Sequence, residues 1–209
     1  GGQGTFMGFH STFASNNHSP EFDLNEDYLQ RSVKAFAVIV AASITAITIN
    51  IMSMFQSVGE ALRHSAFTVA SVISTTGFMT VDFDLWPELS KNILVVIMFI
   101  GACAGSTGGG IKISRILILF KSLSKELEML IHPREVKKIK LDGHVVEHET
   151  LRTVNVYMVS YVLIFMVSML LISFDNHSFT TNFTAVCATI NNIGPGLEAV
   201  GPTQNYAFF

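Results

Sequence analysis

Charged residues are scarce in this chain, and three long stretches contain none. Lys, Arg, Asp and Glu together make up 14% of the 209 residues, whereas apolar residues make up 49%. The uncharged stretches are residues 35–59, 92–111 and 153–174, and each is long enough to cross a bilayer core of about 30 Å. A soluble domain would have too little polar surface to cover three such stretches. The composition therefore predicts a membrane protein.

Cysteine is scarce as well, and the uncharged stretches contain no Asp, Glu or His. Cys103 and Cys187, the two cysteines of the chain, lie in apolar or glycine-rich segments, which argues against a secreted disulfide framework. No basic flank precedes an apolar stretch at the N-terminus, so no secretory signal is expected there. Without carboxylates or imidazoles in the apolar helices, the sequence predicts that this chain is not an enzyme.

The basic residues are distributed asymmetrically. Nine of the thirteen Lys and Arg residues lie within residues 112–152, and Arg31 and Lys34 precede the first uncharged stretch. Only Arg63 and Lys91 lie elsewhere. By the positive-inside rule, residues 112–152 and the N-terminal stretch are expected to be cytoplasmic. Because the basic residues mark a membrane edge and are interspersed with Glu, nucleic acid is not an expected partner.

One unit of the sequence occurs almost twice. It consists of a long uncharged segment, a shorter mixed segment and a glycine-marked turn, STTGF around Gly77 and NNIGP around Gly194. Aligning these glycines gives an offset of 117 residues, which also aligns residues 35–59 with residues 152–176 without a gap. A membrane helix followed by a re-entrant turn lines an ion pathway with backbone carbonyls. The repeat therefore indicates permeation.

The expected fold is an all-α membrane protein of helix–pore loop–helix repeats, with re-entrant half-helices and a broken second helix. The first repeat comprises a spanning helix (28–55), a pore helix (57–74), a filter (75–78) and a broken helix (87–131). The incomplete second repeat comprises a spanning helix (153–174), a pore helix (178–191) and a filter (192–196). Residues 1–27 are expected to form a cytoplasmic loop and residues 132–152 a cytoplasmic connector.

Five glycines interrupt the second long segment of the first repeat: Gly101, Gly105, Gly108, Gly109 and Gly110. Glycines at this density break a helix, so two helices are expected, at about residues 87–101 and 112–130, with an unwound loop between them. Non-helical backbone at membrane depth persists only against protein or a water-filled cavity. The loop is therefore expected to line the pathway.

The segments STTGF, GACAGSTGGGIKISRILILFK and NNIGPGL, at these spacings, resemble the Trk/Ktr family of potassium-transporting membrane subunits, most closely the TrkH type. The resemblance runs from about residue 28 to about residue 201. It implies four repeats around one pore, of which this chain is a fragment with the third repeat and most of the fourth. The residues of the potassium filter would be Thr75, Thr76, Gly77, Phe78, Asn192, Ile193, Gly194 and Pro195. Residues 101–110 would gate the pore beneath this filter.

The same resemblance implies a multi-pass protein of the bacterial inner membrane that transports K⁺ and needs no cofactor. It also implies a homodimer and a cytoplasmic nucleotide-binding regulatory subunit of the TrkA/KtrA-like kind. We take residues 112–152 as the hypothetical surface for that subunit. Channel-like and ion-coupled transport both stay open, as does permeation by Na⁺.

Two other motifs suggest different chemistry. Residues 105–112 resemble a phosphate-binding loop, but Ile111 separates the glycines from Lys112 and no strand precedes them. The segment HVVEH at residues 144–148 matches an inverted zinc-protease motif, although the preceding Asp142-Gly143 favours a hairpin or loop and no third ligand is evident. A membrane-embedded zinc hydrolase and a non-conducting structural or receptor subunit are therefore the alternatives.

Overall fold

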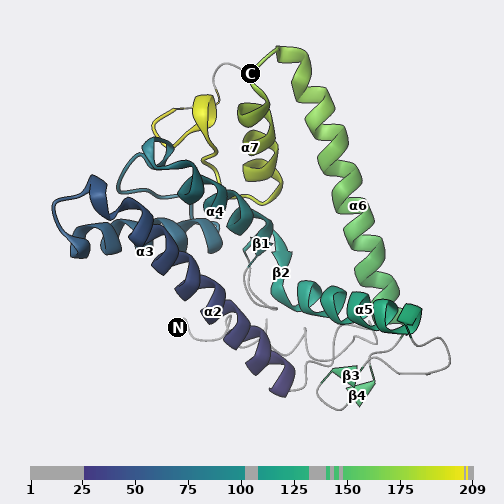
Figure 1. Cartoon of the computed structure of the whole chain (residues 1–209). Coiled ribbons are helices and arrows are strands. Elements are labelled where there is room, and N and C mark those ends of the chain that lie inside the picture. The colour runs from purple at the N-terminus through teal and green to yellow at the C-terminus, as the bar shows by residue number, and fades with distance from the viewer. Residues whose placement is uncertain are drawn as a thin grey trace, which may run out of the picture.

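The computed structural model describes residues 26–101, 108–131, 140–141, 144–145, 148–204 and 206. These residues are mostly helical, and the long helices α2 (Glu26–Ile51) and α6 (His148–Ile172) lie on opposite sides of the molecule (Figure 1). The expectation of a mainly helical fold is confirmed. The N-terminal loop expected at residues 1–27 lies almost entirely outside the described residues.

The first repeat forms α2, α3 (Val58–Ile73) and α4 (Glu88–Phe99), with short 3₁₀ helices at Met52–Met54 (η1) and Phe83–Leu85 (η2). The start of α3 is fixed by Ser57, whose hydroxyl accepts the Glu60 N–H at 3.2 Å. The Glu60 carboxylate in turn accepts the N–H of Gln56 at 3.3 Å. This reciprocal arrangement resembles a capping box and satisfies N–H groups that a helix start leaves unpaired.

The second repeat forms α6, α7 (Phe179–Ile190) and 3₁₀ helices at Ser173–Asp175 (η3) and Glu198–Val200 (η4). α6 begins at His148, so its first turn lies within residues 132–152, the range expected for the connector. No Gly or Pro interrupts residues 148–152, and Glu149 in the first turn favours a helix start.

The glycine-rich interval separates α4 from α5 (Ile113–Ile131). Within the interval, β1 (Ile100–Gly101) pairs in parallel with β2 (Ile111–Lys112), so the chain returns beside itself before α5 begins. Residues 102–107, and with them Gly105, lie outside the described residues. The apolar run of residues 92–111 is therefore not one helix.

A second pair of short strands follows α5. β3 (Lys140–Leu141) and β4 (His144–Val145) are antiparallel, with Leu141 opposite His144. This pairing agrees with the hairpin favoured for the segment that contains the zinc-protease motif. The dipeptide between the strands lies outside the described residues.

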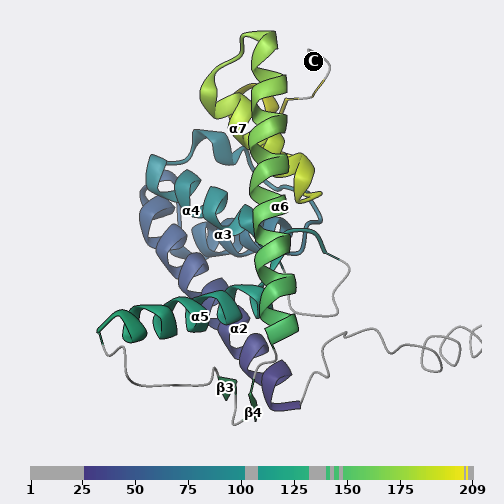
Figure 2. The ribbon, with the colours of Figure 1, turned by 90° about the vertical axis from the view of Figure 1, so that its right-hand side faces the viewer.

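Within the described residues, two helical segments are long and apolar enough to cross a membrane, Ser32–Met54 and Glu149–Asp175. Only 17% and 6% of their most apolar windows are buried inside the chain, unlike the core helix of a soluble protein. In both views α5 runs across the lower end of α6 at a steep angle (Figures 1 and 2). The shorter helices α4 and α7 lie in contact between α2 and α6 (Figure 1).

Aromatic side chains join the two repeats. Phe99, at the end of α4, lies 5.6 Å from Phe165 of α6 and 6.0 Å from Phe183 of α7 between ring centroids. Phe165 and Phe183 also meet edge to face at 5.2 Å. Such pairs bury large apolar areas and prefer these tilted geometries. This cluster holds the end of α4, and therefore the glycine-rich interval, against the second repeat.

Candidate functional site: two glycine turns and the neck of a loop

The two short helices α3 and α7 end in the same way. We call Thr75–Phe78 turn A and Asn192–Pro195 turn B. In turn A the N–H of Thr76 donates to the carbonyl of Ser71 at 2.9 Å, and in turn B the N–H of Ile193 donates to the carbonyl of Ala188 at 2.8 Å. The donor and acceptor residues of the second bond each lie 117 positions after those of the first. The repeat found in the sequence is therefore also a repeat of backbone structure.

Each turn contains two residues with positive φ. Gly77 and Gly194 have φ values of 76° and 109°, as expected for glycines that must adopt unusual dihedrals. Thr75 and Asn192, the first residues of the turns, have φ values of 57° and 55°. Asn tolerates this region, but a β-branched Thr there is strained. A plain helix end would place Gly at this position, so the strain favours a functional constraint on turn A.

Turn A and turn B lie against each other. A Cβ at Gly77 would be 2.2 Å from the carbonyl oxygen of Ile193 and 3.3 Å from Cδ of Pro195. No side chain fits at Gly77 without moving the backbone of turn B. A Cβ at Gly194, in contrast, would meet no atom within 4 Å. The turns thus share a surface at Gly77, whereas turn B is open at Gly194.

The glycine-rich interval reaches the bases of both turns. We call residues 100–101 and 108–112 the neck. Gly109 donates its N–H to the hydroxyl of Thr75 at 3.4 Å, and a Cβ at Gly109 would lie 1.9 Å from the carbonyl oxygen of Asn191. A Cβ at Gly101 would lie 2.4 Å from the carbonyl oxygen of Gly109. Glycine is therefore required where the two sides of the neck lie close together and where the neck touches Asn191, the residue before turn B.

A lysine at the end of the neck binds another residue of the neck. Lys112, immediately before α5, donates from Nζ to the carbonyl oxygen of Gly108 at 2.5 Å. A charge-assisted hydrogen bond of this kind is stronger than one between neutral groups. The bond connects the start of α5 to the part of the neck that approaches the turns.

After each turn, the chain is fastened to the short helix that precedes it. In the first repeat Nδ1 of His64 and the hydroxyl of Thr80 are hydrogen-bonded at 2.8 Å. In the second repeat the hydroxyl of Thr181 donates to the carboxylate of Glu198 at 3.0 Å. The 117-residue offset aligns His64 with Thr181, so equivalent positions of α3 and α7 form these hydrogen bonds. The side chains differ, because the first bond uses an imidazole and the second a hydroxyl and a carboxylate.

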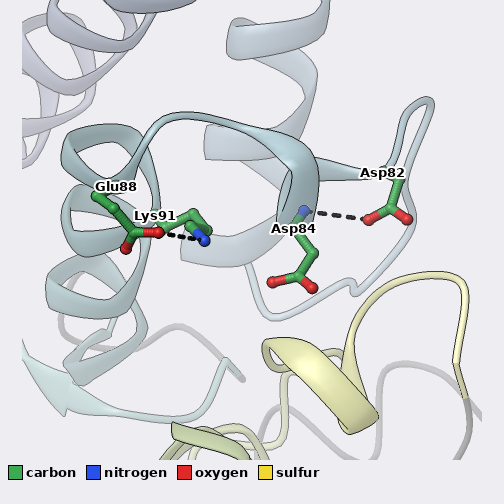
Figure 3. A network of polar contacts seen from close by, with 4 residues as sticks. All are labelled: Asp82, Asp84, Glu88 and Lys91. Atoms are coloured by element: carbon green, nitrogen blue, oxygen red, sulfur yellow. Dashed lines mark hydrogen bonds and ion pairs between the residues drawn. The ribbon is translucent and has the colours of Figure 1, made fainter.

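Charged side chains gather where the chain leaves the turns. Lys91 and Glu88 form an ion pair at 2.7 Å on the first turns of α4, beside the segment that holds Asp82 and Asp84 (Figure 3). Hydrogen bonding to Glu88 is the main cause that raises the pKa of Lys91. Thr203 follows turn B, and its hydroxyl donates a hydrogen bond to the carboxylate of Asp82 at 2.9 Å. The segments that follow turn A and turn B are thus connected on this side.

Glu198 is the carboxylate of the second repeat on this side. It accepts hydrogen bonds from the hydroxyls of Ser178 and Thr181, which lie at the N-terminus of α7. The bond from Ser178 is the main cause that lowers the pKa of Glu198, and the partial burial of the carboxyl opposes it. The helix N-terminus favours a negative charge at this position as well.

The zinc-protease motif at residues 144–148 lies only partly within the described residues. His144 lies in β4 and His148 begins α6, and Glu147 lies outside the described residues. Among the described residues, no group of three or more His, Cys, Asp or Glu side chains could hold a metal ion.

Sequence reasoning missed three residues of this region. Asn191, the residue before turn B, is fully buried and accepts a hydrogen bond from Tyr161 of α6 at 2.9 Å. Glu198 was not singled out either. A comparison of the two repeats could have found Tyr161 and Asn191, since the offset aligns Tyr161 with Ile44 and Asn191 with Ser74. The second repeat thus has a phenol where the first has an alkyl chain.

Comparisons with known proteins agree with this architecture. Residues 31–208 match the family model TrkH, described as a cation transport protein. The chain is 40% identical over 155 residues to the Trk system potassium uptake protein TrkH of Salmonella typhimurium (strain LT2), covering 74% of this chain and 32% of the relative. It is 29% identical over 178 residues to TrkI of Halomonas elongata, covering 85% of this chain and 36% of the relative.

A solved structure is similar as well. The crystal structure of the potassium transporter TrkH from Vibrio parahaemolyticus matches with a TM-score of 0.74 and 35% sequence identity, over 81% of this chain and 36% of that chain. The chain thus spans about a third of the length of the relatives it matches. These relatives are transporters rather than enzymes, which leaves the zinc hydrolase without support. The chain belongs to the TrkH family of membrane cation transport proteins.

Proposed function

We propose that this chain forms part of a transporter that carries K⁺ across the bacterial inner membrane, and that turns A and B supply part of its selectivity filter. The observation that carries the proposal is the contact between the two turns, in which Gly77 lies against the carbonyl of Ile193. A dehydrated cation needs several oxygens at one place, and two equivalent turns side by side provide backbone carbonyls there.

The helices that lead to the turns support a cation site. α3 and α7 end at Ile73 and Ile190, and one residue separates each helix end from its turn. The C-terminal end of a helix carries partial negative charge, which attracts a cation. The names of the relatives, Trk system potassium uptake proteins, favour K⁺ as that cation.

We further propose that the glycine-rich interval gates this filter. Gly109 of the neck contacts Thr75 of turn A and the residue before turn B, so displacement of the neck would change the surroundings of both turns. The backbone of glycine is free enough to permit such movement. Residues 101–110 would thereby block or open the path beneath the filter. Gly101, Gly108, Gly109 and Gly110 carry this proposal among the described residues.

The experiment is ion flux into liposomes that contain the complete transporter of which this chain is proposed to form a part. We expect uptake of K⁺ down its gradient, with Na⁺ taken up more slowly. Liposomes without protein supply the baseline. Absence of K⁺ uptake, or equal uptake of both ions, would contradict the proposal. A non-conducting subunit would give the baseline for both ions.

The remaining proposals concern assembly. We propose a homodimer in the membrane and a nucleotide-binding regulatory subunit that contacts residues 112–152 on the cytoplasmic side. The basic residues of α5 support this surface, because Lys121 and Lys125 belong to a helix that lies across the end of α6 (Figure 2). Site-specific crosslinking from Lys125 to the regulatory subunit tests the contact. Crosslinks confined to other cytoplasmic segments would refute it.

A further inference from the structure

The side chain of Asn191 is held at both ends of its amide. Its Oδ1 accepts a hydrogen bond from the hydroxyl of Tyr161 at 2.9 Å, and its Nδ2 donates to the carbonyl of Cys187 at 2.9 Å. Asn191 is fully buried. In a buried site an amide oxygen needs a donor, because water cannot replace it. The hydroxyl of Tyr161 therefore fixes the orientation of this amide.

Asn191 occupies the position at which α7 becomes turn B. The helix ends at Ile190, and turn B begins at Asn192. The backbone carbonyl of Asn191 also forms the surface against which Gly109 of the neck lies. The side chain of Asn191 is thus fixed by α6, while its backbone touches both the turn and the neck.

In the described part of the first repeat, this contact has no counterpart. The 117-residue offset aligns Asn191 with Ser74 and Tyr161 with Ile44. The hydroxyl of Ser74 is satisfied locally, by the carbonyl of Ala70 at 2.6 Å and the hydroxyl of Thr76 at 2.7 Å. Turn A therefore needs no donor from its long helix, whereas turn B depends on one.

We propose that Tyr161 is a positioning residue for ion selectivity, which holds the start of turn B in its ion-selecting conformation through Asn191. This inference rests on the proposed function, because it assigns a determinant to the filter proposed above. The hydroxyl acts through the amide of Asn191 and does not itself bind the ion. Its loss leaves a buried oxygen unpaired, so the amide must turn or water must enter beside turn B.

A neighbouring tyrosine provides a matched control. Tyr157 lies one helical turn before Tyr161 on α6, and Cζ of Arg115 lies 4.0 Å above the centre of its ring. Phenylalanine at this position keeps a ring for that cation–π contact. Within the described residues, the Tyr157 hydroxyl has no hydrogen-bond partner. Tyr157→Phe and Tyr161→Phe thus remove the same atom from the same helix, and only one removal breaks a bond to the base of turn B.

The experiment measures K⁺ and Na⁺ flux in liposomes that contain the complete transporter. We expect Tyr161→Phe to lower the K⁺-to-Na⁺ flux ratio by about three- to tenfold, from the loss of one buried hydrogen bond. Tyr157→Phe should keep the wild-type ratio. Asn191→Ser combined with Tyr161→Phe removes the unpaired amide and imitates the first repeat, so we expect it to recover part of the ratio.

The outcomes separate the two proposals. An unchanged ratio in Tyr161→Phe overturns the inference and leaves the proposed function intact. So does an equal fall of K⁺ and Na⁺ flux, which indicates a general structural role. If Tyr161→Phe does not fold, the double variant decides, and a wild-type ratio there overturns the inference. A wild-type transporter that does not prefer K⁺ overturns the proposed function itself, and the inference with it.

Discussion

Replacement of Gly77 by alanine tests whether turn A and turn B act together. Gly77 has a φ of 76°, and a Cβ at this position would lie 2.2 Å from the carbonyl oxygen of Ile193. That oxygen would have to withdraw by about 1 Å to reach an ordinary contact distance. Neither atom belongs to a flexible side-chain end, since Cβ is attached to the backbone and the oxygen is a backbone carbonyl. The strain must therefore be taken up by the turns themselves.

The magnitude follows from two effects. A Cβ at positive φ costs roughly 1–2 kcal/mol. Forcing an extra methyl group into a packed site costs typically about 1–3 kcal/mol more. We expect Gly77→Ala to lower the free energy of unfolding by about 2–5 kcal/mol. Because the displaced oxygen belongs to turn B, we also expect the K⁺-to-Na⁺ flux ratio to fall by about tenfold or more.

Two other glycines separate the causes. Gly194 also has positive φ, but a Cβ there would meet nothing within 4 Å, so Gly194→Ala introduces strain without the contact. Gly59, in the first turn of α3, has open space around its position as well, and Gly59→Ala should change neither quantity by much. The assay is ion flux in liposomes together with thermal unfolding of each variant. If Gly77→Ala selects K⁺ as the wild type does, or loses no more than Gly194→Ala, contact between the turns does not determine selectivity.

Three further predictions concern the neck and the segment after turn B. Gly109→Ala would place a Cβ 1.9 Å from the Asn191 carbonyl, so it should displace the neck and raise basal K⁺ flux several-fold; unchanged flux would refute the gate. Lys112→Met should also raise basal K⁺ flux, by about tenfold or less, whereas Lys112→Arg keeps the positive charge and should keep the basal flux of the wild type. Equal flux in both variants would refute the role of the charge. Glu198 has a lowered pKa, so its carboxylate stabilises the fold above pH 4.5 and this contribution is lost as pH falls through the lowered pKa. Wild type should thus unfold at a higher temperature than Glu198→Gln at neutral pH and lose that advantage in acid; a constant difference would contradict this.

Several features of the site could be predicted from the sequence because they depend on neighbouring residues. The break between α4 and α5 follows from the density of glycine, since each glycine weakens a helix through its backbone freedom. The positive φ of Gly77 and Gly194 follows from the same freedom. The equivalence of the turns followed from the 117-residue repeat, because similar local sequences form similar helix ends.

Other features could not be predicted because they depend on packing between distant segments. The left-handed φ of Thr75 contradicts the preference of a β-branched residue and persists only because surrounding structure holds it. The start of α6 at His148 could not be placed from the sequence, since the charged residues before the apolar run gave no sign that the helix begins among them. Glu198 is one acidic residue among several, and its bonds to Ser178 and Thr181 exist only in the folded chain.

The sequence by itself determined the class of protein, the presence of its long apolar helices and the positions of its two turns, because hydropathy, charge and glycine content act over short distances along the chain. Only the tertiary structure decided which parts meet. It placed Gly77 against Ile193, Gly109 against Asn191, and the hydroxyl of Tyr161 on the Asn191 amide. These contacts arise from the packing of α4, α6 and α7 around the Phe99 cluster, where shape and polar pairing between distant residues select one arrangement.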